Sequence, residues 1–89
     1  MSNIDIKKLK SIFAALSNEK RLKIIDLCST KEYTITELSK TLKLNYSITV
    51  EYTSMLEKAS LVRKSRNEDK TVRVKSLIHL NNSGEIKIV

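Results

Sequence analysis

The side chains of this chain that could act chemically are mostly cations, and they are densest near its C-terminal end. The 89 residues carry 17 Lys and Arg against 10 Asp and Glu, which gives a formal net charge of +7. Residues 61–89 hold seven of those cations and three carboxylates, whereas residues 31–60 hold four of each. A basic protein of this size usually binds a polyanion, most often nucleic acid, although a generally basic, soluble surface would give the same composition.

Cys28 and His79 are the other reactive side chains, and each of these residue types occurs once. A single cysteine forms no internal disulfide, and one cysteine with one histidine is too few for a tight metal site, which needs three or four ligands. Cys28 follows a run of aliphatic residues at helical spacing, which favours core packing over reactivity. His79 is expected to be a solvent-facing strand residue, although its position among cations would also suit titration near neutral pH.

Catalytic and membrane signals are missing from the sequence. It contains no Gly-rich phosphate loop, no Ser-His-Asp order and no Cys-His pair. No apolar run is long enough to span a bilayer, and the first ten residues, MSNIDIKKLK, lack the apolar core and cleavage site of a signal peptide. We therefore expect an intracellular protein that is not an enzyme and needs no cofactor.

Hydrophobic spacing predicts helices that could position a nucleic-acid-binding surface. They cover residues 4–16, 19–29, 34 or 36 to about 42, and 45 to about 59. Asn18 and Asn45 can cap the second and fourth of these helices, and Thr34 with Glu37 fits a capping box at the third. The first helix carries an apolar stripe made of Ile6, Leu9, Ile12, Phe13 and Leu16. The inward face of the fourth helix is predicted to consist of Ile48 or Thr49, Tyr52, Leu56 and Ala59, with Met55 alongside.

Residues 61–80 predict a basic two-stranded hairpin with a polar tip at residues 67–70. Side chains alternate along a strand, so one face of the second strand collects Val72, Val74, Ile78 and Leu80, and the other collects Thr71, Arg73, Lys75 and His79. One apolar and one basic face are typical of a half-buried hairpin. The tail over residues 81–89 fits either a short helix capped by Asn82 and Ser83, or a third strand with Ile86 and Ile88 facing inward.

A helix, a tight turn, a second helix and a basic hairpin, in that order, form the layout of a winged helix-turn-helix. We predict a single α+β, mainly α, domain over residues 1–89, with three to four helices followed by a C-terminal β-hairpin wing. Its recognition helix spans about residues 45–59 and its wing about residues 61–80. Such a module places one helix in the major groove of double-stranded DNA.

Three stretches resemble regulators of the ArsR type. ALSNEKRLKIIDLC is similar to their second helix, and TITELSKTLKL followed by NYSITVEYTSMLEKASLV resembles the helix-turn-helix of archaeal and bacterial winged-helix repressors. LEKASLV matches their common exit from the recognition helix, with Ser60 where glycine is usual. The resemblance covers about residues 9–80 and implies a transcriptional regulator that acts as a homodimer. The Lys-, Ile- and Asn-rich composition fits an AT-rich genome, such as that of an archaeon or its virus.

The resemblance also implies which residues face DNA. The outward residues of the recognition helix are Asn45, Tyr46, Ser47, Val50, Glu51 and Ser54. Asn and Ser suit base edges or phosphates, and Tyr46 suits a phosphate or a thymine methyl group. The wing would bring Lys64, Arg66, Lys70 and Arg73 to the backbone or the minor groove, and Lys43, just before the turn, is a further phosphate contact.

The chain departs from the ArsR pattern in three places. Positions 47, 50 and 51 often carry Lys or Arg in relatives, but here they are Ser, Val and Glu. The segment Ile35-Thr36-Glu37-Leu38 stands where the metal-sensing members carry paired cysteines, so we expect no bound metal. Those members dimerise through the first helix and a long final helix, for which the tail is too short, so a dimer here would use the first helix or a wing edge.

Two other functions fit the same residues. The chain could be a winged helix that docks on a protein through the Glu51 surface, or a sequence-neutral DNA-coating protein held by Lys and Arg alone. Glu51 itself could accept from cytosine N4, repel non-cognate DNA, or remain a solvated helix charge. Only the regulator predicts tighter binding to a cognate sequence than to random duplex.

Overall fold

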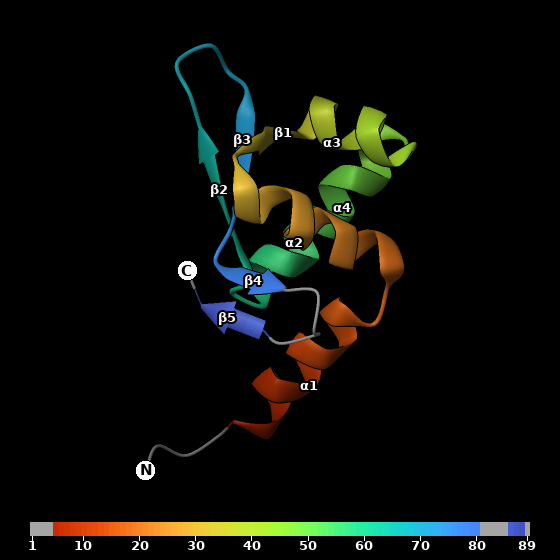
Figure 1. Ribbon diagram of the computed structural model, residues 1–89, viewed down its shortest axis with the longest axis vertical. Helices are drawn as coiled ribbons and strands as arrows, with labels where there is room; N and C mark the ends of the chain where they lie inside the picture. The colour runs from red at the N-terminus through yellow and green to blue at the C-terminus, as the bar shows by residue number, and fades with distance from the viewer. Residues whose placement is uncertain (1–4, 81–85, 89) are drawn as a thin grey trace.

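Helices pack on one side of a small antiparallel sheet in the computed structural model, which describes residues 5–80 and 86–88 (Figure 1). The helices of these residues are α1 (Ile6–Leu16), α2 (Glu19–Thr30), α3 (Ile35–Leu42) and α4 (Tyr46–Lys58). The strands are β1 (Tyr33–Thr34), β2 (Val62–Arg66), β3 (Val72–Ser76), β4 (Ile78–Leu80) and β5 (Ile86–Ile88). The predicted fold class, a mainly helical winged helix-turn-helix, is therefore confirmed.

Side-chain caps begin α2, α3 and α4 at the predicted residues. The Asn18 side chain accepts from the backbone of Arg21 at the start of α2, and the Asn45 side chain accepts from the backbone of Ile48 at 2.8 Å at the start of α4. Thr34 and Glu37 form both bonds of the predicted capping box. α1 begins after Asp5, which caps it, and residue 4 of the predicted helix lies outside the described residues.

The sheet contains a strand that the sequence did not predict. Its order is β1-β3-β2, with antiparallel pairing throughout, and Val74 of β3 lies between Tyr33 of β1 and Lys64 of β2. Residues 30–33, between the second and third predicted helices, were assigned no helix or strand from the sequence, but Tyr33 and Thr34 pair with β3. A strand of two residues shows no periodicity of its own, because its hydrogen-bond partners come from a distant part of the chain.

The second strand of the predicted hairpin is divided in two. β3 ends at Ser76, whose buried hydroxyl donates to the carbonyl of Ile78 and accepts from the Ile78 backbone N–H. β4 then leaves the wing and pairs with β5 in a separate two-stranded sheet. The strand alternative for the tail is thus confirmed for residues 86–88. The proposed caps Asn82 and Ser83, and the facing of Leu80, Ile86 and Ile88, lie outside what the structure describes.

The core lies between α2, α3, α4 and the sheet. It is built on fully buried aliphatic side chains, among them Ile24, Ile25, Leu38, Leu56 and Val74. Cys28 packs there as predicted, and burial raises the pKa of its thiol from the usual 9.0 to about 12. Thr49 is the residue of the predicted Ile48-or-Thr49 pair that is buried, and Thr53, which was not predicted to face inward, is buried one turn later.

α1 is the helix that the core covers least. Of its residues only Ala15 is buried, whereas Ile6 is 79% exposed and Phe13 is 63% exposed. Figure 1 shows α1 extending away from the other helices at the opposite end from the wing. The apolar stripe of this helix is therefore only partly covered by its own chain. Across residues 5–80 and 86–88, the helices are too short or too polar to cross a membrane.

Candidate nucleic-acid interface

The exposed face of α4 carries the polar residues that the sequence assigned to DNA. Asn45, Ser47 and Glu51 are exposed, together with Tyr46, which is 56% exposed. Val50 is exposed next to them, and Ser54 is half-buried. The capping bond of Asn45 starts the helix at Tyr46, so Tyr46 and Ser47 lie in the first turn of α4 and Val50 and Glu51 in the next.

The β2–β3 hairpin forms the wing, and its turn is closed by short-range hydrogen bonds. The backbone N–H of Lys70 donates to the carbonyl of Asn67 at 2.9 Å, and Lys70 takes a positive φ of 66°. The Asp69 carboxylate accepts from the hydroxyl and the backbone N–H of Thr71, and these two bonds hold the pKa of Asp69 below its usual value. A closed turn of this kind keeps the exposed cations Arg66 and Lys70 at defined positions.

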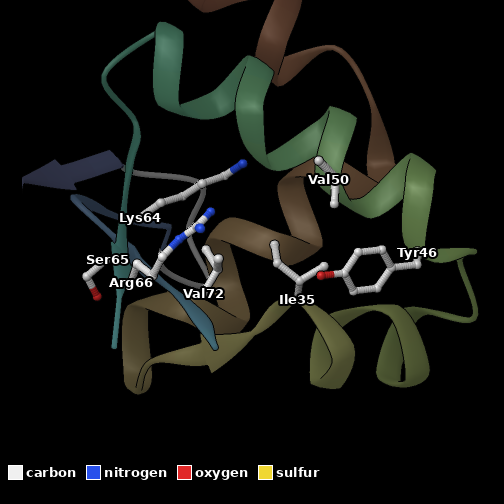
Figure 2. A pocket seen from close by; sticks show the side chains of 7 residues that line it. All are labelled: Ile35, Tyr46, Val50, Lys64, Ser65, Arg66 and Val72. Atoms are coloured by element: carbon white, nitrogen blue, oxygen red, sulfur yellow. The ribbon is translucent and has the colours of Figure 1, made fainter. Parts of the chain in front are cut away.

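A groove of about 360 Å³ separates α4 from the wing, and Figure 2 shows the side chains that line it. Tyr46 and Val50 line it from α4, and Lys64 and Arg66 line it from β2. The remaining lining residues are Ile35, Ser65 and Val72. An apolar floor with cations along one wall is thus formed by two elements that meet only in the folded chain.

A smaller groove of about 250 Å³ continues past Tyr46 toward the wing tip. It is lined by Lys70 and Thr71 from the wing and by Thr34 and Thr36 at the start of α3. Together the two grooves are lined by five of the predicted residues, which are Tyr46, Val50, Lys64, Arg66 and Lys70. Lys43, Asn45, Ser47, Glu51, Ser54 and Arg73 are not among the residues that line either groove.

Lys64 and Ser54, both assigned to DNA by the sequence, are bonded to each other. The Lys64 Nζ donates to the Ser54 Oγ at 2.8 Å, and the Lys64 backbone N–H donates to the Glu57 Oε2 at 3.3 Å. Partial burial lowers the pKa of the Lys64 ammonium below its usual value, and the nearby Glu57 carboxylate opposes that effect. Lys64 therefore differs from Arg66, which is exposed on the same strand.

Two cations of α2, Lys20 and Arg21, donate to backbone carbonyls of neighbouring helices. Neither of them was assigned a role from the sequence. The buried Arg21 donates through Nε to the carbonyl of Ala15 at 2.8 Å and through Nη2 to that of Ala14 at 3.1 Å. Its guanidinium also lies 5.0 Å from the centroid of the Tyr52 ring on α4. The only signal in the sequence was a cation among the apolar residues of a central helix.

Lys20 supports the helix-turn-helix in a similar way. Its Nζ donates to the carbonyl of Leu42 at 3.0 Å, at the last residue of α3. The chain then turns through Lys43, which has a positive φ of 56°, before Asn45 starts α4. A carbonyl at a helix C-terminus has no partner within its own helix, so the ammonium stabilises the end that defines the turn.

Groups of three or more potential metal-binding side chains are not found among residues 5–80 and 86–88. The one cysteine is buried, and its raised pKa keeps the thiol protonated at neutral pH. Because thiolate is the form that binds metal or reacts, Cys28 is unsuited to either role in the folded chain.

A helix-turn-helix joined to a basic β-hairpin defines a winged-helix DNA-binding protein. Residues 18–64, more than half of the chain, match the family model described as "Bacterial regulatory protein, arsR family". The chain belongs to the ArsR family, and it is a DNA-binding transcriptional regulator of that family. A comparison with curated protein sequences found no match.

Solved structures support the assignment. Reduced HlyU from Vibrio cholerae is 30% identical over 79% of this chain and 73% of its own, with a TM-score of 0.69. NolR from Sinorhizobium fredii shares the fold at 22% identity, over 93% of this chain and 85% of its own, with a TM-score of 0.72. The homodimeric winged helix-turn-helix DNA-binding domain of Mb0332 from Mycobacterium bovis shares the fold at 18% identity, over 85% and 75%, with a TM-score of 0.73.

Proposed function

We propose that residues 1–89 act as a single winged-helix domain that lays α4, the recognition helix of about residues 45–59, in the major groove of double-stranded DNA. The wing, within residues 61–80, then contacts the phosphate backbone. The observation that carries this proposal is the groove of Figure 2, where Tyr46 and Val50 of α4 face Arg66 of the wing. A strand of DNA that separates a major from a minor groove would pass between these two walls.

The proposed contacts divide by chemistry. Asn45 and Ser47 would bond base edges or phosphates, Tyr46 and Val50 would meet thymine methyl groups, and Glu51 would accept from cytosine N4. The cations Lys43, Arg66, Lys70 and Arg73 would neutralise phosphates, and Ser54 and Lys64 would complete the surface at the base of the groove. The phosphate contacts would supply most of the affinity, and the helix would supply the specificity.

We also propose that the regulator is a homodimer that packs through α1. The exposed apolar side chains of this helix, including Ile6 and Phe13, support it, as does the homodimeric state of the Mb0332 domain. A dimer would read two half-sites about 34–36 Å apart.

The remaining expectations complete the proposal. The regulator would work inside the cell, near the nucleoid, without enzymatic activity, a cofactor or a metal effector. The Lys-, Ile- and Asn-rich composition supports an AT-rich source such as an archaeon or its virus. Occupancy of a promoter would exclude polymerase or, in other settings, recruit it.

The test is a fluorescence-anisotropy titration at two salt concentrations. It compares random duplex with DNA from upstream of the protein's own gene. Tighter binding to the upstream DNA at both salts is the expected result. Equal and steeply salt-dependent binding to both duplexes would instead indicate a coating protein, and no binding at low salt would indicate a protein-contact module.

Ser47→Ala provides the sharper test of direct readout. We expect it to weaken binding to cognate DNA by about 0.5–1.5 kcal/mol, and binding to random DNA by less, if the hydroxyl bonds a base edge. Asn45→Ala would be harder to interpret, because the Asn45 side chain also caps α4. Equal losses on cognate and random duplex for Ser47→Ala would contradict base readout at this position.

A further inference from the structure

Lys64 links the wing to the recognition helix through two separate bonds. Its ammonium donates to Ser54 at 2.8 Å, and its backbone N–H donates to the Glu57 carboxylate at 3.3 Å. Ser54 and Glu57 are three residues apart on α4, so both acceptors lie on one face of that helix. Lys64 also pairs with Val74, which is fully buried in the central strand β3. One residue thus joins α4 to the middle of the sheet.

The position of the Lys64 ammonium differs from that of a typical phosphate contact. Figure 2 shows its side chain reaching across the groove toward α4, whereas the exposed Arg66 lies two residues further along the same strand. The half-burial of Lys64 and the lowered pKa of its ammonium both show that this charge is partly withdrawn from water. A long cationic side chain of this kind fixes geometry at the cost of its own freedom.

We propose that Lys64 is a positioning residue, which sets the angle between the wing and the recognition helix through its bond to Ser54. The consequence for DNA rests on the proposed function: the fixed angle determines whether Arg66 and Lys70 meet phosphates while α4 is seated in the major groove. Lys64 would then contribute to discrimination between sequences, and Arg66 to affinity for any duplex.

A double-mutant cycle distinguishes positioning from phosphate contact. The variants are Lys64→Met, which removes the charge and shortens the side chain by one atom, Ser54→Ala, and the two combined. Arg63→Met, at the exposed neighbouring residue, is the control for loss of one charge from β2. We expect Lys64→Met to leave the salt slope of DNA binding unchanged and to lower the ratio of cognate to random affinity by roughly two- to thirty-fold. Ser54→Ala should lower that ratio similarly, and the double variant should add little.

Two results would overturn the proposal in favour of a phosphate contact. The salt slope of DNA binding would fall by about one in Lys64→Met, and the affinity losses of Lys64→Met and Ser54→Ala would add independently in the double variant. Arg66→Ala in the same assay gives the change in salt slope that loss of a phosphate contact causes. Ser54→Ala removes only a hydroxyl from a half-buried site, so it keeps the test valid if Lys64→Met unfolds the chain.

A measurement without DNA separates the failure of this inference from failure of the proposed function. Backbone order parameters of the wing, measured by NMR relaxation, should fall in Lys64→Met and Ser54→Ala but stay near the roughly 0.85 of rigid backbone in Arg63→Met. Unchanged order parameters in the first two variants would overturn the positioning role. If the parent chain bound no DNA but its wing loosened as expected, the proposed function alone would fail.

Discussion

Arg21 is a charged residue that is buried in the described structure, where it is 9% exposed. Its guanidinium donates to the carbonyls of Ala14 and Ala15 in the last turn of α1 and lies over the ring of Tyr52 on α4. A buried charge is tolerated only when hydrogen bonds replace its water. Arg21 therefore joins α1, α2 and α4 at one point.

Arg21→Met should lower the free energy of unfolding by about 2–4 kcal/mol, because it removes the charged hydrogen bonds to the carbonyls of Ala14 and Ala15. The Ala14 carbonyl keeps its bond from the Ser17 hydroxyl, but the Ala15 carbonyl loses its side-chain donor. Equilibrium urea unfolding followed by circular dichroism measures the change. Lys23→Met is the matched control in the same helix, since the Lys23 side chain forms an exposed ion pair with Glu19, whose loss should cost less than about 0.5 kcal/mol. Similar losses for both variants would contradict the structural role of Arg21.

At the level of elements, the capping box of α3 couples the helix-turn-helix to pH. The bond that the Glu37 carboxylate accepts from the Thr34 backbone N–H, with the Thr34 hydroxyl close by, holds the pKa of this carboxyl below the usual 4.5. Because the folded-state pKa is depressed, the stabilisation is fully present above the unfolded value. It is lost as the pH falls through the folded value.

Glu37→Gln should reduce the loss in the free energy of unfolding that occurs when the pH is lowered. The amide oxygen of Gln can still accept from the Thr34 backbone, but it does not titrate. The free energy of unfolding of the parent should therefore fall more than that of the variant between about pH 5 and pH 3. The pKa of Asp69 is also lowered, but Asp69 is present in both proteins, so the difference between the two urea-unfolding profiles isolates Glu37. Parallel profiles would show that the capping box does not act in solution.

The wing is the other element whose role can be measured directly. Arg66→Ala and Lys70→Ala should each weaken binding to cognate and to random duplex by the same factor. Each should also reduce the salt slope of binding by about one, because each removes a proposed phosphate contact. Anisotropy titrations over several salt concentrations give the slope. Lys23→Ala, which removes a charge from α2, should leave it unchanged, and an equal effect of all three changes would point to net charge alone.

At the scale of the whole molecule, α1 carries large apolar side chains that are exposed in the described structure. Ile6, Leu9 and Phe13 are exposed large apolar residues on this one helix, at the end away from the wing. Exposed apolar side chains gathered on one element often mark an interface. This supports the proposed dimer.

Phe13→Asp should convert the dimer to a folded monomer, because it places a carboxylate in the proposed apolar contact while leaving the core untouched. Sedimentation velocity measures the change in mass, and circular dichroism confirms the fold. Lys7→Asp, on another face of α1, should remain dimeric. A parent chain that sediments as a monomer at all concentrations would contradict the dimer altogether.

Much of the fold could be predicted from the sequence, because its signals are local. The Asn18 and Asn45 caps and the Thr34–Glu37 capping box involve residues three apart, and all three form. The helices follow from spacing within one or two turns, and the wing follows from alternation within a strand. These properties belong to neighbouring residues and were determined by the sequence alone.

Only the tertiary structure decided how these elements meet. The pairing of Tyr33 with Val74, the burial of Arg21 against Tyr52, and the bond from Lys64 to Ser54 each join different elements. The same holds for the candidate site: its residues were chosen from the sequence, but which of them share a groove depended on the packing of β2 against α4. Packing is set by the joint burial of many side chains, and no short window of sequence contains that information.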